Sequence, residues 1–151
     1  MSEEITMAES PIGVGGAVEG LDPIYVCKEP RDIAPVLAVL GCRSSPAFRY
    51  FYEHYSGGFS SEVTSYELLD LVDDTTNIQT QTQAVREVHG WPSRYLVLSD
   101  YLANAVLVYD CETDAVFNVD FEGSDQELIK GKLQPDWKSF EDFLAYYFAP
   151  E

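Results

Sequence analysis

The sequence predicts an α+β fold, a single domain in which an antiparallel β-meander is packed by several α-helices. The first observation is the stretch 95–122, where three apolar runs lie about ten residues apart. Strands this close can be joined only by hairpins, because a parallel crossover needs a dozen or more residues. The second observation is a set of capped helical patterns on both sides of this stretch. The third is the length of 151 residues, which suits one domain with its own core.

Residues 1–21 are expected to form a flexible lead-in, and residues 22–151 to form the folded domain. The lead-in contains the small-residue segment PIGVGGAVEG, but a dinucleotide-binding loop would need glycine where Val18 stands. Pro23–Cys27 is interpreted as a short edge strand, because proline is tolerated in a sheet mainly at its edge.

Two helices are predicted next. The first, Ile33–Leu40, follows the capping residue Asp32 and ends at Gly41. The second begins at Ser45, with a proline in its first turn, and ends at a Gly-Gly pair. Its aromatic residues share one face at helical spacing: Phe48, Phe51, Tyr52 and Tyr55. A stripe of this kind is typical of a core and not of a ligand site.

The middle of the chain reads as a strand near Ser61–Tyr66, then a short strand or turn near Leu68–Leu71. Asn77 then caps a polar helix, Ile78–His89. The apolar stripe of this helix is thin, so we expect it to lie on the outside of the core.

The meander consists of the runs Tyr95–Leu98, Ala105–Tyr109 and Ala115–Phe121. The second run is apolar on both faces, as in a central strand. The third alternates apolar and polar residues, which predicts one buried face and one face that is partly wet. Its apolar side chains are those of Phe117, Val119 and Phe121. The terminal helix, with a capping box at Ser139–Asp142, is expected to cover that buried face.

The charge balance excludes several functions. The net charge is −17, and the eight carboxylates between Arg94 and Lys130 have no Lys, Arg or His among them. This argues against binding to nucleic acid and to anionic lipid. The acidity serves solubility or attracts a basic partner. An odd number of cysteines, no signal peptide and no long apolar run predict a cytoplasmic protein.

No catalytic or cofactor-binding motif is found in the sequence. Asp110, Glu112 and Asp114 have a spacing that could suggest a calcium loop, but Ala115 and Phe121 stand where glycine and glutamate are needed. A hairpin turn explains them better. We therefore predict no enzyme, no metal and no cofactor. Paired carboxylates for glycoside chemistry would depend on their separation in space. An enzyme acting on a cationic substrate is the weakest alternative.

The order of the parts resembles the SUKH superfamily, bacterial toxin-immunity proteins of the Syd/Knr type. The resemblance covers about Ile33–Phe148 and is carried by the aromatic helix SPAFRYFYEHYSGGF, the meander and the SFEDFL signature. Ser45-Pro46 stands where the family usually has Leu-Pro, and Ala103-Asn104 replaces a glycine-containing first hairpin. The resemblance implies a curved antiparallel sheet packed by helices, and no catalytic site.

The function implied by this resemblance is that of an immunity protein, which binds and neutralises a cognate toxin, often a nuclease. The alternative is a regulatory scaffold module of the same fold without a toxin partner. A basic toxin would meet the acidic meander, while each carboxylate alone also fits a solvated hairpin end. The candidate partner-binding residues are Asp100, Tyr101, Tyr109, Asp110, Glu112, Asp114, Asp120 and Glu122.

Overall fold

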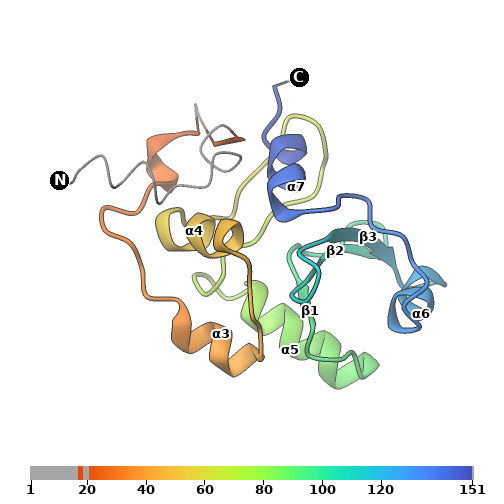
Figure 1. Cartoon of the computed structure of the whole chain (residues 1–151). Coiled ribbons are helices and arrows are strands. Elements are labelled where there is room, and N and C mark those ends of the chain that lie inside the picture. Colours follow the sequence, from red (N-terminus) through yellow and green to blue (C-terminus); the bar gives the residue numbers. More distant parts are fainter. Residues whose placement is uncertain (1–16, 19–20, 151) are drawn as a thin grey trace.

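The computed structural model describes residues 17–18 and 21–150. Most of the predicted lead-in therefore lies outside the described residues, although Val18 is buried against the core. Three strands form one antiparallel sheet in the order β1-β2-β3, which confirms the meander and the α+β class (Figure 1). The elements are η1 (Pro23–Tyr25), α3 (Ala34–Leu40), α4 (Pro46–His54), α5 (Ile78–His89), β1 (Tyr95–Val97), β2 (Ala105–Asp110), β3 (Val116–Asp120), α6 (Ser124–Ile129) and α7 (Phe140–Tyr147).

The central strand β2 pairs with both neighbours. Val108 lies opposite Val97 of β1 and Phe117 of β3. The first hairpin turns through Ala103 and Asn104, whose φ angles of 52° and 65° are both positive. Positive φ at both central residues is what a type I′ turn requires, and this turn matches the twist of the strands. The turn therefore forms without the glycine that usually occupies it.

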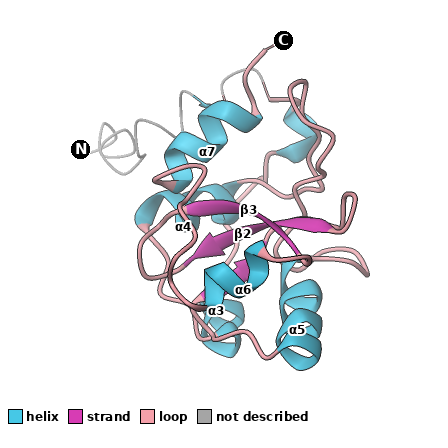
Figure 2. Cartoon of the chain, turned by 90° about the vertical axis from the view of Figure 1, so that its right-hand side faces the viewer, coloured by secondary structure: helices cyan, strands magenta, loops and turns pink. Residues whose placement is uncertain are grey.

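Both faces of the sheet are buried. One face, with Leu107 and Tyr109, packs against α4 and α7, and the other, with Val106 and Val108, packs against α5 and α6. Figure 2 shows α4 and α7 on one side of the sheet and α5 and α6 on the other. The prediction of a partly wet face is correct only for single positions of β3, such as Asn118 and Asp120.

The terminal helix lies on the opposite face from the one predicted. The Phe140 ring of α7 lies 5.5 Å from the Tyr109 ring, which stacks on Phe48 of α4 at 4.5 Å. The face that carries Phe117 and Val119 is covered instead by α5 and α6. The short helix α6 was not predicted, and its presence leaves no room for α7 on that face.

The predicted helix ends are largely confirmed. Ser45, Asn77 and Ser139 each accept a hydrogen bond from a backbone amide in the first turn of α4, α5 and α7. Gly41 ends α3 with a φ of 71°, in the left-handed region that glycine adopts readily. Asp32 does not occupy the N-cap position of α3, but its carboxylate accepts from the Ala34 amide.

Two predicted strands are wrong. Pro23–Cys27 begins with a 3-10 turn, because the Asp22 carboxylate accepts from the Ile24 amide, and only Val26 makes an isolated bridge. Residues 61–66 form no strand. The Ser61 hydroxyl accepts from the Val63 amide and donates to a carbonyl of α7, so the local backbone turns instead of extending.

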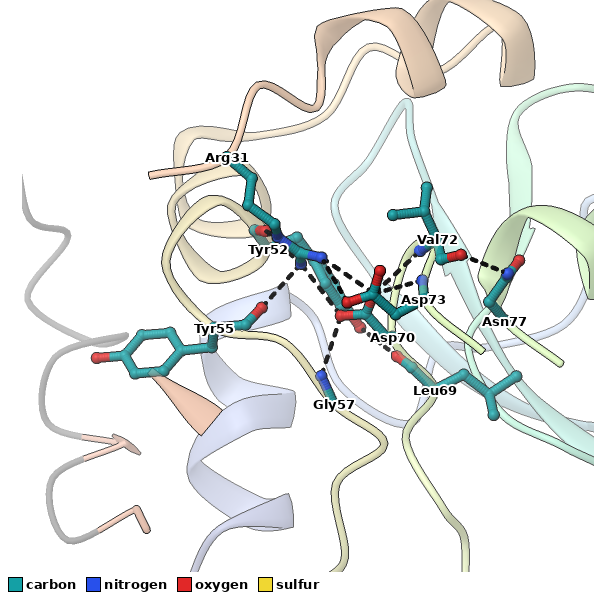
Figure 3. Close-up of polar contacts among 9 residues, drawn as sticks. All are labelled: Arg31, Tyr52, Tyr55, Gly57, Leu69, Asp70, Val72, Asp73 and Asn77. Atoms are coloured by element: carbon teal, nitrogen blue, oxygen red, sulfur yellow. Dashed lines mark hydrogen bonds and ion pairs between the residues drawn. The ribbon is translucent and has the colours of Figure 1, made fainter. Parts of the chain in front are cut away.

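An ion pair between Arg31 and Asp70 organises the irregular segments (Figure 3). Arg31 Nη1 and Nη2 each lie 3.1 Å from an oxygen of Asp70, whose side chain is almost fully buried. The same guanidinium donates to the carbonyls of Tyr52 and Tyr55 at the end of α4. Asp70 accepts further bonds from the Gly57, Val72 and Asp73 amides. One carboxylate thus joins three chain segments, the one before α3, the one after α4 and its own turn, and Arg31 adds the end of α4.

The hydroxyl of Tyr147 fixes the loop between α4 and α5 to the terminal helix. It accepts a hydrogen bond of 2.9 Å from the Leu68 amide. It also lies 2.8 Å from the Phe59 carbonyl and 2.7 Å from the Tyr66 carbonyl, either of which can take its proton. These contacts supplement the two backbone hydrogen bonds of the isolated Phe59–Leu68 bridge, where no regular strand forms.

Replacing Asp70 by asparagine should lower the free energy of unfolding by about 2–3 kcal/mol, because Arg31 loses its counter-ion in a largely buried site. Chemical denaturation at pH 7 measures this. Asp73→Asn is the matched control: its carboxylate is 61% exposed and lies 3.6 Å from Arg31. The control should change stability by less than about 0.5 kcal/mol. Equal effects of the two variants would contradict this role of Asp70.

The contribution of Asp70 should also depend on pH. Burial alone would raise its pKa, but the hydrogen bonds from Arg31 and from three backbone amides outweigh this and lower the pKa. A lowered pKa adds stability above the unfolded value of about 3.9, and this stability is lost as the pH falls through the folded value. The stability difference between wild type and Asp70→Asn should therefore shrink below about pH 4. A difference that grows on acidification would contradict this assignment.

Tyr147→Phe should destabilise the protein by about 1–3 kcal/mol, because the buried Tyr66 carbonyl loses its hydrogen-bond partner and the Phe59–Leu68 bridge loses a supporting contact. Tyr146→Phe is the control on the same helix. Tyr146 is 39% exposed, and its hydroxyl makes no hydrogen bond among the described residues. Thermal and urea unfolding of both variants measure the difference, and a Tyr146→Phe loss of similar size would argue against the role of the Tyr147 hydroxyl.

Candidate functional site

The candidate residues fall at the two opposite ends of the sheet. One group lies where β1 ends, β2 begins and β3 ends, since Ala105 pairs with Asp120. We call this the Asp100 end, and its candidates are Asp100, Tyr101, Asp120 and Glu122. The other group follows β2 at the second hairpin, beside Arg94. We call this the Arg94 end, and its candidates are Tyr109, Asp110, Glu112 and Asp114. Because β2 has six residues, the ends lie roughly 17 Å apart.

At the Asp100 end, Asp100 and Tyr101 follow β1 and are both exposed. The Asp100 carboxylate accepts from the Tyr101 amide at 2.8 Å and from the Gln81 side chain at 3.2 Å. Tyr101 is 50% exposed, and its ring lies 5.7 Å from the ring of Phe121. The tyrosine therefore presents an aromatic surface from a position that is partly fixed.

Asp120 and Glu122 complete this end. Asp120 accepts hydrogen bonds from the Glu122 and Ser124 amides, which lower the pKa of its carboxyl. Glu122 accepts from the Asn104 side chain at the neighbouring hairpin. The ion pairs among the described residues include none of Asp100, Asp120 and Glu122. Their negative charges are therefore not cancelled by a direct contact with a guanidinium or ammonium group.

An aromatic cluster around Phe121 packs against Tyr101 at this end of the sheet. The Phe121 ring stacks on the His89 ring at 4.7 Å and on the Trp91 ring at 5.7 Å. It also contacts the ring of Tyr101. Leu102 beside it is 37% exposed. Sequence reasoning placed Phe121 in the core and did not connect His89 and Trp91 with the site. Nothing in the local sequence indicates this contact, because the residues come from separate elements.

At the Arg94 end, Asp110 is buried and holds Arg94. Its two oxygens accept from Arg94 Nε at 3.1 Å and Nη2 at 2.7 Å, and the Glu112 amide donates to it as well. Burial alone would raise the pKa of Asp110, but these hydrogen bonds lower it. Glu112 is exposed and lies 3.4 Å from Arg94 Nη1. Asp110 is thus neutralised within the fold.

Tyr109 and Asp114 also serve the fold. Tyr109 is fully buried, so the prediction that its ring anchors a partner at the surface is wrong. Its hydroxyl donates to Asp114 at 2.7 Å and accepts from the Ser45 amide at 3.2 Å, and burial raises its pKa. The second oxygen of Asp114 accepts from the Phe140 amide. These bonds join the second hairpin to the starts of α4 and α7.

Within residues 17–18 and 21–150, the structure gives no group of three His, Cys, Asp or Glu side chains that could hold a metal ion. In the same described part, no helix is long and apolar enough to cross a membrane.

Cys42 and Cys111 are buried free thiols, and the contact with Cys42, together with burial, raises the pKa of Cys111. Such thiols are weak nucleophiles.

The comparison with protein families gives one match. The model of the SMI1 / KNR4 family (SUKH-1) matches residues 29–146, which include the whole sheet and nearly all of α7. No curated protein matches the chain. The family match confirms the resemblance seen in the sequence and covers more than half of the chain. The protein therefore belongs to the SMI1/KNR4 family, SUKH-1, a family of immunity-protein-like domains.

Proposed function

We propose that this protein is an immunity protein, which binds a cognate toxin and neutralises it through the Asp100 end of the sheet. The observation that carries the proposal is the set of three exposed carboxylates at the same end as the half-exposed Tyr101, which form no ion pair with any residue that the structure describes. Membership in the SMI1/KNR4 family supports the class of function. The partner that fits this surface is a protein with a basic surface.

The physical basis is electrostatic attraction followed by local packing. A net charge of −17 draws a basic partner toward the molecule and accelerates encounter. Carboxylates at the contact then select a complementary surface. A tyrosine at the centre of such a patch buries a large apolar area, while its hydroxyl stays hydrogen-bonded. A nuclease toxin needs a cationic cleft for phosphate, so an acidic end can occlude it.

The Arg94 end is less suited to this role. Asp110 and Asp114 are committed to hydrogen bonds within the fold, and only Glu112 has an exposed carboxylate there. Substitutions of Asp110 or Asp114 would disturb the hairpin and would not report on a partner. The Asp100 end can be changed with less effect on the core.

The partner can be identified with the whole chain as bait in a lysate of its source cell. We expect a basic protein whose complex dissociates as the salt concentration rises. The isolated partner should be toxic when it is expressed alone, and co-expression of this chain should restore growth. A partner without toxicity would contradict the immunity function and favour a regulatory scaffold.

Neutralising the acidic surface should slow association with that toxin. The triple variant Asp100→Asn, Asp120→Asn and Glu122→Gln keeps the hydrogen-bond acceptors and removes three charges. At low salt the association rate should fall by about tenfold or more, because steering is lost. Stopped-flow binding measures the rate, and growth protection measures the consequence.

The control variant Glu29→Gln, Glu62→Gln and Asp142→Asn removes the same charge from exposed positions elsewhere. It should change the association rate by less than about threefold, since distant exposed charges are screened. Equal effects of the two triple variants would show that only net charge matters and would refute the role of the Asp100 end.

A further inference from the structure

A pocket of about 600 Å³ opens at the Arg94 end of the sheet. Three segments that are distant in sequence form its wall: Gly41, Arg43 and Ser44 before α4, Ser93 and Arg94 before β1, and Cys111 and Glu112 after β2. This volume lies in the range of small-molecule sites. The pocket lies away from the acidic surface at the Asp100 end.

The wall of this pocket carries positive charge, although the chain as a whole is strongly acidic. Arg43 is exposed and has no ion-pair partner among the described residues. Arg86 of α5 lies behind the wall and donates to the Ser93 carbonyl at 2.8 Å. It too has no carboxylate partner in the described part of the chain, and burial lowers its pKa. Three of the nine basic residues therefore gather here.

Two buried polar atoms at this pocket have no hydrogen-bond partner in the described structure. They are the Ser44 hydroxyl, which belongs to the wall, and Arg86 Nε behind it. A buried donor without a partner costs about 1–3 kcal/mol, so native proteins rarely keep one without a bound water, an ion or a ligand. The Ser44 hydroxyl can donate, and because Ser44 lines the pocket, an acceptor such as an anion bound there would give it a partner.

Glu112 is the carboxylate that now lies beside the pocket face of Arg94. Arg94 uses Nε and Nη2 for Asp110, and only Nη1 faces Glu112, at 3.4 Å. The Glu112 side chain is 66% exposed, and an exposed pair of this length contributes little. When Glu112 moves out, Nη1 of Arg94 becomes free for another anion, and Arg43 brings a second guanidinium to the pocket wall. Arg43 and Arg94 against Asp110 then leave one positive charge at the wall, which favours an anionic ligand such as phosphate.

We propose that this pocket binds a phosphate group of a small molecule, contacted by Arg43, Ser44 and Nη1 of Arg94. Glu112 is displaced when the ligand enters. The flat fork of arginine donors fits the oxygens of phosphate in pairs. Arg43 can offer such a fork, while Arg94 adds Nη1 and Ser44 adds its hydroxyl. The remaining volume accommodates the organic part of a phosphate monoester.

The experiment is a calorimetric titration of the whole chain in a phosphate-free buffer. The probes are inorganic phosphate, glycerol 2-phosphate and acetate. Saturable binding of phosphate or of the ester, with no binding of acetate, is the expected result. Tighter binding of the ester than of phosphate would support contacts with its organic part. Absence of saturable binding of both phosphate compounds would overturn the proposal, and acetate binding as tight as that of phosphate would overturn the assignment to phosphate.

Three variants locate the site. Arg43→Gln should weaken binding by about tenfold or more, because one charge-assisted contact is lost. Glu112→Gln should strengthen it several-fold, since the competing carboxylate loses its charge. Both side chains are exposed, so neither change should affect folding. Lys28→Gln is the control, at the far end of α4, where Cys27 bonds to His54. Unchanged affinity in Arg43→Gln, or equal losses in Arg43→Gln and Lys28→Gln, would refute this location.

Discussion

The ion pair between Arg31 and Asp70 is the constraint on which the irregular half of the molecule depends. The chain between α4 and α5 contains neither helix nor regular strand, yet it carries buried leucines at positions 68, 69 and 71. Isolated bridges at Phe59–Leu68 and Leu68–Ser99 satisfy only some of its backbone groups, and the others need side-chain partners. The buried carboxylate of Asp70 and the hydroxyl of Tyr147 provide them. Burial of these two polar groups is tolerated because each makes several hydrogen bonds.

The sequence predicted the regular elements well where local chemistry decides them. Helix ends followed from Ser45, Asn77 and Ser139, and the meander followed from the spacing of its apolar runs. The face that α7 covers could not be predicted, because β2 offers Leu107 and Val108 to opposite sides with equal burial. The choice depends on α6, whose short sequence has no side-chain cap and little apolar pattern. The region around Ser61 was misread because side-chain bonds outweighed strand propensity.

The candidate site was predictable in its composition but not in its arrangement. The acidic residues are evident from the sequence, whereas their division between two ends depends on strand register and hairpin position. Burial of Tyr109 agrees with its place in the central run that is apolar on both faces, whereas burial of Asp110 could not be inferred, because it lies at the strand end where alternation no longer indicates a face. The pocket beside Arg43 was not foreseen either. It is built from three segments that only the fold brings together.

Covering the sheet on both faces has a consequence for how the protein can diversify. Every side chain of β2 from Val106 to Asp110 is buried, so recognition is confined to the turns and strand ends. The buried positions of these short strands stabilise the fold, while the exposed turns and strand ends are left for contact with a partner. Exposed positions such as Asp100 and Glu122 can accumulate substitutions without altering the packing beneath them. A lineage of such proteins can therefore change its partner repeatedly while it keeps one scaffold, and coevolution with a partner would act mainly on the loops.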